Sequence, residues 1–161
     1  MASRALITDE ASQFAAALPD GGVLLALDLG TKTIGLATCD AGWRFAAAGK
    51  TLARGKFTKD CTQIAEIVTA RAVKGIVIGL PRNMDGSEGP RAQSSRAYAR
   101  NLSGNLDLPI LLWDERWSTA SADAAMIESD LSRAKRAERI DAQAAAVILQ
   151  GAIDRLAGGM L

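Results

Sequence analysis

The chain has 161 residues, with 19 Lys and Arg, 18 Asp and Glu, no histidine and a formal net charge of +1. The missing histidine excludes Ser-His-Asp and Cys-His catalytic triads, histidine zinc sites and imidazole general bases. The length fits one domain, and 48% hydrophobic with 23% charged residues is typical of a globular protein. Because aromatic residues make up only 4%, we expect Leu, Ile, Val and Ala to build the core.

Residues 1–22 are predicted to form an N-terminal extension, in which a short helix over 11–18 ends at Pro19 and the glycines that follow. A single domain is expected over 23–157, followed by a tail at 158–161. No internal repeat and no low-complexity linker divides the chain further.

Three strands are expected to open the domain. The apolar run Val23–Leu29 predicts a strand buried on both faces, although Asp28 interrupts it near its end. Its hairpin partner is predicted at Thr33–Cys39, where β-branched residues recur, and a third strand is predicted at Trp43–Ala48.

The rest of the domain alternates helices with apolar strands. Helical periodicity predicts helices with one buried face, and short apolar runs between polar turns predict buried strands. In chain order these are a helix at Phe57–Val73, a strand at Ile76–Leu80, a loop at Pro81–Gly89, a helix at Pro90–Leu102, a turn at Gly104–Asp107, a strand at Pro109–Trp113, a helix from Ser118 to Asp130, a basic connector at Leu131–Glu138 and a helix at Ile140–Leu156. This order predicts a five-stranded mixed sheet with helices on both faces.

Three carboxylates stand out by where they lie. Asp28 ends an apolar strand, Glu115 follows another, and Asp141 opens the apolar face of the last helix. Acids at the carboxyl ends of buried strands point into the crevice where open α/β sheets bind ligands, and a buried carboxylate is costly unless paired or bound to a metal. If the first and last strands are neighbours, the three acids form an oxygen-only cluster of the kind that Mg²⁺ or Mn²⁺ prefers.

Each acid also has an ordinary structural explanation. Asp28 can form a turn before Gly30. Glu115 can pair with Arg116, and Asp141 can be a carboxylate favoured by the helix dipole. The combination of three acids, each attached to a buried element, favours the metal site. Two such ions roughly 4 Å apart can support phosphodiester hydrolysis, which needs no histidine.

Basic residues gather locally although the net charge is near zero. Lys32 and Arg116 flank two of the acids, which makes them the better candidates for contacts with phosphates beside a metal. For the helix members of a second group, a solvated helix face is the more ordinary explanation. This second group, in the loop and helix that follow the strand at Ile76–Leu80, consists of Arg82, Arg91, Arg96 and Arg100.

Four segments resemble the motifs of the YqgF/RuvX family, in the family's order and spacing. They are Ala26–Ala37, Ile78–Pro81 combined with Asp85–Ser87, Trp113–Thr119 and Ile140–Leu149. One such motif would be weak, but four in register are specific. The resemblance covers most of the predicted domain.

The resemblance implies an RNase H-like fold of three α/β/α layers and a metal-dependent endonuclease. It places the catalytic acids, which would also hold Mg²⁺ or Mn²⁺, at Asp28, Glu115 and Asp141. The implied substrate is structured precursor rRNA, cut to mature the 5′ end of 16S rRNA, with ribosomal particles as partners. The alternative is a Holliday junction resolvase that cuts branched DNA. A monomer or a homodimer is expected.

Two further functions fit parts of the sequence. Asp28–Lys32 also resembles the first phosphate loop of actin, Hsp70 and sugar kinases, but that fold needs two domains and this length predicts one. A non-catalytic RNA-binding module of the same fold would leave the acids unused. ATP binding or a failure to bind Mg²⁺ and Mn²⁺ would favour these alternatives.

The cysteines and the apolar runs predict the compartment. Cys39 and Cys61 form no CxxC pair, so we expect two small buried side chains or reduced thiols. The first residues contain no apolar stretch of the signal-peptide kind, and every apolar run falls far short of the roughly 20 residues that cross a membrane. We therefore expect a cytoplasmic protein with no membrane partner.

Overall fold

The computed structural model describes residues 6–19, 21–115 and 133–158, and for 133–141 it describes the backbone alone. The helix predicted from Ser118 to Asp130 lies outside these residues. None of the helices in this part of the chain is long and apolar enough to cross a membrane. The elements in chain order are β1 (Ile7–Thr8), α1 (Ala11–Ala17), β2 (Val23–Leu29), β3 (Thr33–Cys39), β4 (Ala46–Ala53), α2 (Phe57–Arg71), β5 (Val73–Leu80), α3 (Pro90–Leu106), β6 (Ile110–Asp114) and α5 (Arg133–Gly158).

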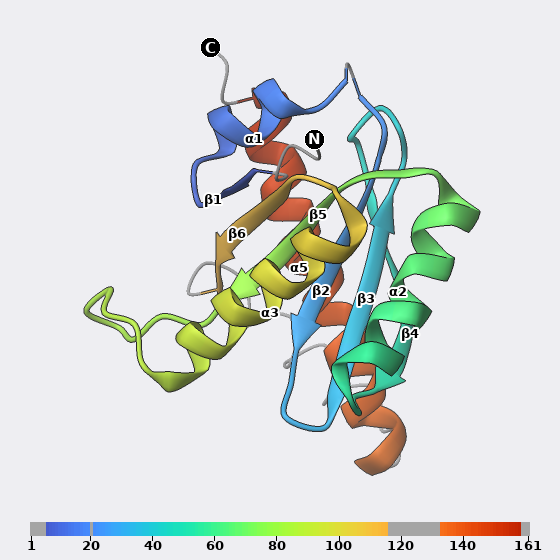
Figure 1. Cartoon of the computed structure of the whole chain (residues 1–161), viewed down its shortest axis with the longest axis vertical. Coiled ribbons are helices and arrows are strands. Elements are labelled where there is room, and N and C mark those ends of the chain that lie inside the picture. The colour runs from blue at the N-terminus through green and yellow to red at the C-terminus, as the bar shows by residue number, and fades with distance from the viewer. Residues whose placement is uncertain (1–5, 20, 116–132, 159–161) are drawn as a thin grey trace.

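The strands form one mixed sheet in the order β1-β6-β5-β2-β3-β4 (Figure 1). β1, β6, β5 and β2 are parallel, whereas β3 is antiparallel to β2 and β4 is antiparallel to β3. All five predicted strands are present, and the predicted hairpin of β2 and β3 is confirmed with both ranges unchanged. The additional strand is β1, whose two residues lie in the predicted extension and are too few to produce an alternating pattern.

Alternation along the strands divides the core into two layers. On one face of the sheet, Leu25 and Leu27 of β2 pack with Ile64 of α2 and with α3. On the other face, Leu24 and Ala26 pack with side chains of α1 and α5. Figure 1 shows α2 and α3 in front of the sheet and α5 behind it. This arrangement confirms the predicted α/β architecture with helices on both faces.

Two helix ends differ from the prediction. α2 ends at Arg71 rather than Val73, and α3 runs on to Leu106 through the turn predicted at Gly104–Asp107. In both cases the next residue adopts a left-handed conformation, with φ 51° at Ala72 and φ 53° at Asp107. Such residues are usually glycines, so a sequence pattern that relies on glycine misplaces these ends.

The start of β4 and the start of α5 also differ from the prediction. The strand expected at Trp43–Ala48 begins only at Ala46, because the Asp40 carboxylate accepts three backbone N–H groups, among them that of Phe45, and closes a turn. The connector expected at Leu131–Glu138 is helical from residue 133 onward. Its sequence consists of good helix formers without glycine or proline, so helix propensity outweighs its polar character.

Candidate active site

The carboxyl ends of β2 and β6 bring two of the predicted acids together. Asp28 is half-buried near the end of β2 and follows Leu24 and Ala26 at two-residue intervals, so it lies on the α5 face of the sheet. Glu115 directly follows β6 and is also half-buried. A side-chain hydrogen bond joins the two carboxyl groups.

The route by which the two acids meet differs from the one expected. The sequence argument required β2 and β6 to be neighbours, but β5 lies between them. Gly79 of β5 pairs with Trp113 of β6, and the preceding residue Ile78 pairs with Leu27 of β2. The acid-bearing strands are therefore separated by a strand that carries a glycine at this level.

The environment of Glu115 raises its pKa to about 8. Burial is the largest cause, followed by the hydrogen bond to Asp28 and the negative charge of that residue. Asp114 raises the pKa of Glu115 further, and the positive charge of Arg91 lowers it. Strongly perturbed carboxyl groups of this kind gather at functional sites, so the pair of acids is a candidate active site.

The third acid belongs to α5. Asp141 lies in this helix, but its side chain is among those outside the description, and Arg116 lies outside it altogether. Within the described ranges, no three His, Cys, Asp or Glu side chains form a group that could hold a metal ion. The described part of the site is thus the pair of Asp28 and Glu115.

Two of the basic residues predicted to bind nucleic acid are paired with carboxylates. Arg82 lies 3.2 Å from Asp9, 3.7 Å from Glu88 and 3.8 Å from Asp114, measured from guanidinium nitrogen to carboxylate oxygen. Arg96 donates two hydrogen bonds, of 2.6 and 2.7 Å, to the two oxygens of Glu88. The Arg96 guanidinium accordingly lowers the pKa of Glu88. Through its three carboxylate partners, Arg82 links the segment before α1 to the loop before α3 and to the end of β6.

The exposed basic residues include members of both groups considered from the sequence. Lys32, in the turn after β2, and Arg100, on α3, are both exposed, which a contact with a phosphate requires. Arg91 is also exposed, in the first turn of α3, and its charge acts on Glu115. Its place in the loop and helix after the strand at Ile76–Leu80 puts it in the second group.

The comparisons with known proteins identify the family of this chain. A family model described as "RuvX: Holliday junction resolvase" matches residues 22–155. The chain belongs to the RuvX family. This result confirms the resemblance of the four motif segments.

Relatives and solved structures extend the comparison. The chain is 65% identical to a protein of Novosphingobium aromaticivorans and 62% identical to one of Sphingopyxis alaskensis, covering 95% and 94% of this chain and 98% and 99% of theirs; both carry the name "Putative pre-16S rRNA nuclease". Among solved structures, RuvC of T. thermophilus in complex with a Holliday junction substrate matches with a TM-score of 0.54 and 14% identity, over 85% of this chain and 96% of that one. This likeness shows the fold, which is the predicted RNase H-like one.

One further residue supports the turn that follows Asp28 in the first RuvX motif. Arg54 donates a 2.6 Å hydrogen bond from its guanidinium to the carbonyl of Gly30, and its backbone N–H donates to the carbonyl of Lys32. The guanidinium also lies 5.2 Å from the centre of the Tyr98 ring. Sequence reasoning missed Arg54, because nothing in the chain pattern links it to a turn more than twenty residues away.

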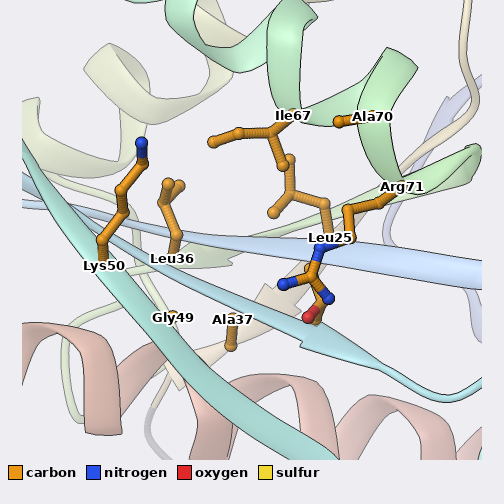
Figure 2. Close-up of a pocket in the computed structure, with 9 residues that line it drawn as sticks. Leu25, Leu36, Ala37, Gly49, Lys50, Ile67, Ala70 and Arg71 are labelled. Carbon is orange, nitrogen blue, oxygen red and sulfur yellow. The ribbon is translucent and has the colours of Figure 1, made fainter.

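An apolar pocket of about 380 Å³ lies away from the acids (Figure 2). Leu25, Leu36 and Ile67 are among its lining residues, and the exposed cations Lys50 and Arg71 extend along its sides. The pocket lies between α2 and the sheet, whereas Asp28 lies on the α5 face. It is therefore separate from the candidate active site of this RuvX-family chain.

Proposed function

We propose that this protein is a metal-dependent endonuclease that cleaves precursor 16S rRNA during maturation of its 5′ end, with ribosomal particles as its context. The observation that carries the proposal is the meeting of Asp28 and Glu115 at the carboxyl ends of two strands. The names of the two relatives support the substrate, and membership of the RuvX family supports the reaction.

The donor set fits a divalent cation. Asp28 and Glu115 offer only carboxylate oxygens, the ligands that Mg²⁺ and Mn²⁺ prefer. Two ionised carboxylates in contact repel, so the pair needs either a shared proton or a cation. Burial first, and then the hydrogen bond to Asp28 and its charge, raise the pKa of Glu115 and favour such a proton in the metal-free protein. Asp141 is our proposed third ligand, because it is the acid of the fourth motif segment and lies on α5, the helix whose Ile148 packs near Glu115.

The residues around the pair have separate tasks in cleavage. A bound divalent cation would act as a Lewis acid on the scissile phosphate and on water. Asp28, Glu115 and Asp141 would hold that cation at the strand ends. Lys32, Arg116 and Arg91 are proposed to contact phosphates beside it, which fixes the substrate without reading its sequence.

The remaining predicted contacts are proposed to lie farther from the bond that breaks. Arg100 is exposed on α3 and is available to a phosphate along the same strand of substrate. Arg82 and Arg96 are paired with carboxylates, so each would have to leave its partner to bind a phosphate. We therefore assign them first to holding the loop between β5 and α3.

The test is cleavage of a precursor 16S rRNA fragment and of a synthetic four-way DNA junction side by side, each with Mg²⁺. The wild-type protein is expected to cut the RNA near the mature 5′ end, and Asp28→Asn is expected to cut neither substrate while retaining its circular dichroism spectrum. Full RNA cleavage by Asp28→Asn would remove the acid pair from the mechanism. Absence of RNA cleavage by the wild type would overturn the assigned substrate.

A Holliday junction resolvase is the second candidate, supported by the description of the RuvX family model and by the likeness to RuvC. A four-way junction is symmetric, so its resolution requires two active sites related by a two-fold axis. Cleavage of the junction but not of the RNA, together with a dimer in sedimentation, would favour this candidate. Strict monomer behaviour at working concentrations would count against it.

A further inference from the structure

We propose that Gly79 is a positioning residue of the acid site, because its missing side chain leaves the space through which Glu115 reaches Asp28 across β5. The inference rests on the proposed function of the two acids as a cation site. It gives a physical role to the second motif segment, Ile78–Pro81, which contains none of the predicted catalytic acids.

The strand order creates the need for such a space. Neighbouring strands lie about 4.8 Å apart, so β2 and β6 lie about 10 Å apart with β5 between them. A side chain on β5 that stands between the two acids would keep their carboxyl groups apart. At the level of Asp28 the residue of β5 is Gly79, because Ile78 pairs with Leu27, and Gly79 pairs on its other side with Trp113, two residues before Glu115.

The space above Gly79 is already filled by its neighbours. A Cβ atom placed on Gly79 would collide with Oε1 of Glu115, and it would lie 2.9 Å from Cδ of Glu115 and 2.7 Å from Cδ1 of Ile148. Real Cβ contacts essentially never fall below 3.0 Å, so either Glu115 or α5 would have to move. The end of a Glu side chain moves more easily than a packed helix, so the carboxyl group is expected to be displaced.

The backbone does not explain the glycine. The described glycines with positive φ are Gly21, Gly22 and Gly86, and Gly79 is not among them. A glycine inside a central strand weakens that strand and usually marks a close approach by another group. Gly79 is therefore required for the space it leaves rather than for its φ angle.

Gly75, four residues earlier on β5, provides a comparison. A Cβ placed there would lie 2.8 Å from Cζ of Phe14 and 2.9 Å from Cδ2 of Leu18, so its space is filled by apolar side chains. A glycine on β5 thus leaves space for apolar core side chains at position 75 and for a carboxyl group at position 79.

The test separates displacement of Glu115 from damage to packing. Ile148→Val removes Cδ1, the atom of α5 that a new methyl group would meet, so the double variant Gly79→Ala with Ile148→Val leaves Glu115 as the remaining obstacle. Ile148→Val alone is the matched control. Mn²⁺ binding is measured by calorimetry in all variants, and thermal melting without metal monitors the fold.

We expect the double variant to bind Mn²⁺ about 10–100-fold more weakly than the control, as is typical when the support of a metal ligand is lost. Adding Glu115→Asp to the double variant shortens the acid by one methylene and is expected to recover part of the affinity. In the wild-type background the same Glu115→Asp change should weaken Mn²⁺ binding, because the shorter acid no longer spans β5. Glu115→Asp would thus strengthen Mn²⁺ binding in the double variant and weaken it in the wild type, and the difference between the two effects measures the coupling between residues 79 and 115.

The outcomes distinguish the inference from the function on which it rests. If the double variant binds Mn²⁺ like its control while Glu115→Gln binds poorly, the role of Gly79 is wrong and the cation site stands. If neither Asp28→Asn nor Glu115→Gln changes Mn²⁺ binding, the cation site itself is wrong. If the double variant does not fold, Gly79→Ala is tested in the Glu115→Asp background, where the shorter acid should leave the alanine with little effect on Mn²⁺ affinity. A further loss of about 10–100-fold caused by the alanine in that background would overturn the inference.

Discussion

On the α2–α3 face of the sheet, Leu27 and Ile78 are fully buried among apolar side chains. The next residues along the same two strands belong to the acid site on the other face: Asp28 is one of its two acids, and Gly79 lies against Glu115. One residue step along a strand reverses the face to which a side chain points. The sheet can therefore hold an apolar core and a charged site back to back, with no element reserved for either one.

The α2–α3 face also contains a buried acid, but its partners are of a different kind. The side chain of Asp60 accepts hydrogen bonds from the backbone N–H of Gly55 at 3.0 Å and from the hydroxyl of Tyr98 at 3.3 Å. Burial and the neighbouring Asp60 raise the pKa of Tyr98, which keeps that hydroxyl a donor. Hydrogen-bond donors satisfy the buried carboxylate of Asp60, so its role is to stabilise the fold. The contact of Asp28 with Glu115 instead requires a cation or a proton between the two acids.

The largest expected effect comes from substituting two neighbouring residues of β2 whose side chains point to opposite faces of the sheet. Leu27→Ala should lower the free energy of unfolding by about 2–5 kcal/mol, because it leaves a cavity in the α2–α3 core. Asp28→Asn should leave the stability of the metal-free protein unchanged or raise it, because it removes a half-buried negative charge beside Glu115. Urea denaturation in the presence of a chelator measures both.

Cleavage activity provides the control for this pair. At temperatures where it remains folded, Leu27→Ala should still cut the substrate, whereas Asp28→Asn should not. A large loss of stability in Asp28→Asn would mean that the acid pair holds the fold together, contrary to the division of the two faces.

A smaller effect is expected from pH. In the metal-free protein the pKa of Glu115 is about 8 rather than its usual 4.5, so between these values the folded state holds a proton that the unfolded chain releases. The free energy of unfolding should therefore fall as pH rises through this window, by at most about 1.4 kcal/mol per pH unit.

The matched variant for the pH effect is Glu115→Gln, which cannot titrate at this position. Denaturation curves from about pH 5 to about pH 8 should be flatter for Glu115→Gln than for the wild type, since one titrating group is missing. Equal slopes in the two proteins would show that Glu115 does not carry the proton.

The smallest effect concerns two arginines on α3. Arg91→Gln should weaken RNA binding several-fold and reduce the salt dependence of the binding constant by about one ion, because Arg91 is exposed and close enough for its charge to act on Glu115. Arg96→Gln should change RNA binding little, because Arg96 is already paired with Glu88. Titrations at several salt concentrations compare the two, and a greater loss in Arg96→Gln would reverse the assignment.

Much of this arrangement could be predicted from the sequence. The run Val23–Leu29 and the segment Thr33–Cys39 form the predicted strands, because a buried strand and its hairpin partner leave clear local patterns. Asp28 and Glu115 were found because acids at the ends of apolar runs are unusual, and the structure brings them together. The role of Asp141 stays a prediction.

What could not be predicted depends on contacts between distant segments. No local pattern places β5 between β2 and β6, so the role of Gly79 emerged only from the strand order. The same holds for Arg82, whose partner Asp9 lies in a segment predicted as an extension. The contact at Gly79 and the ion pair of Arg82 both join residues that are far apart in the chain, so no local sequence pattern predicts them.

The most direct test of the acid pair is a crystal structure of the protein grown with Mn²⁺, with the metal located by its anomalous scattering. We expect a peak between the carboxyl groups of Asp28 and Glu115, at ligand distances of about 2.0–2.2 Å for a small divalent cation. The peak should be absent from crystals of Asp28→Asn grown under the same conditions. A Mn²⁺ ion bound elsewhere, with Asp28 and Glu115 still hydrogen-bonded to each other, would contradict the account.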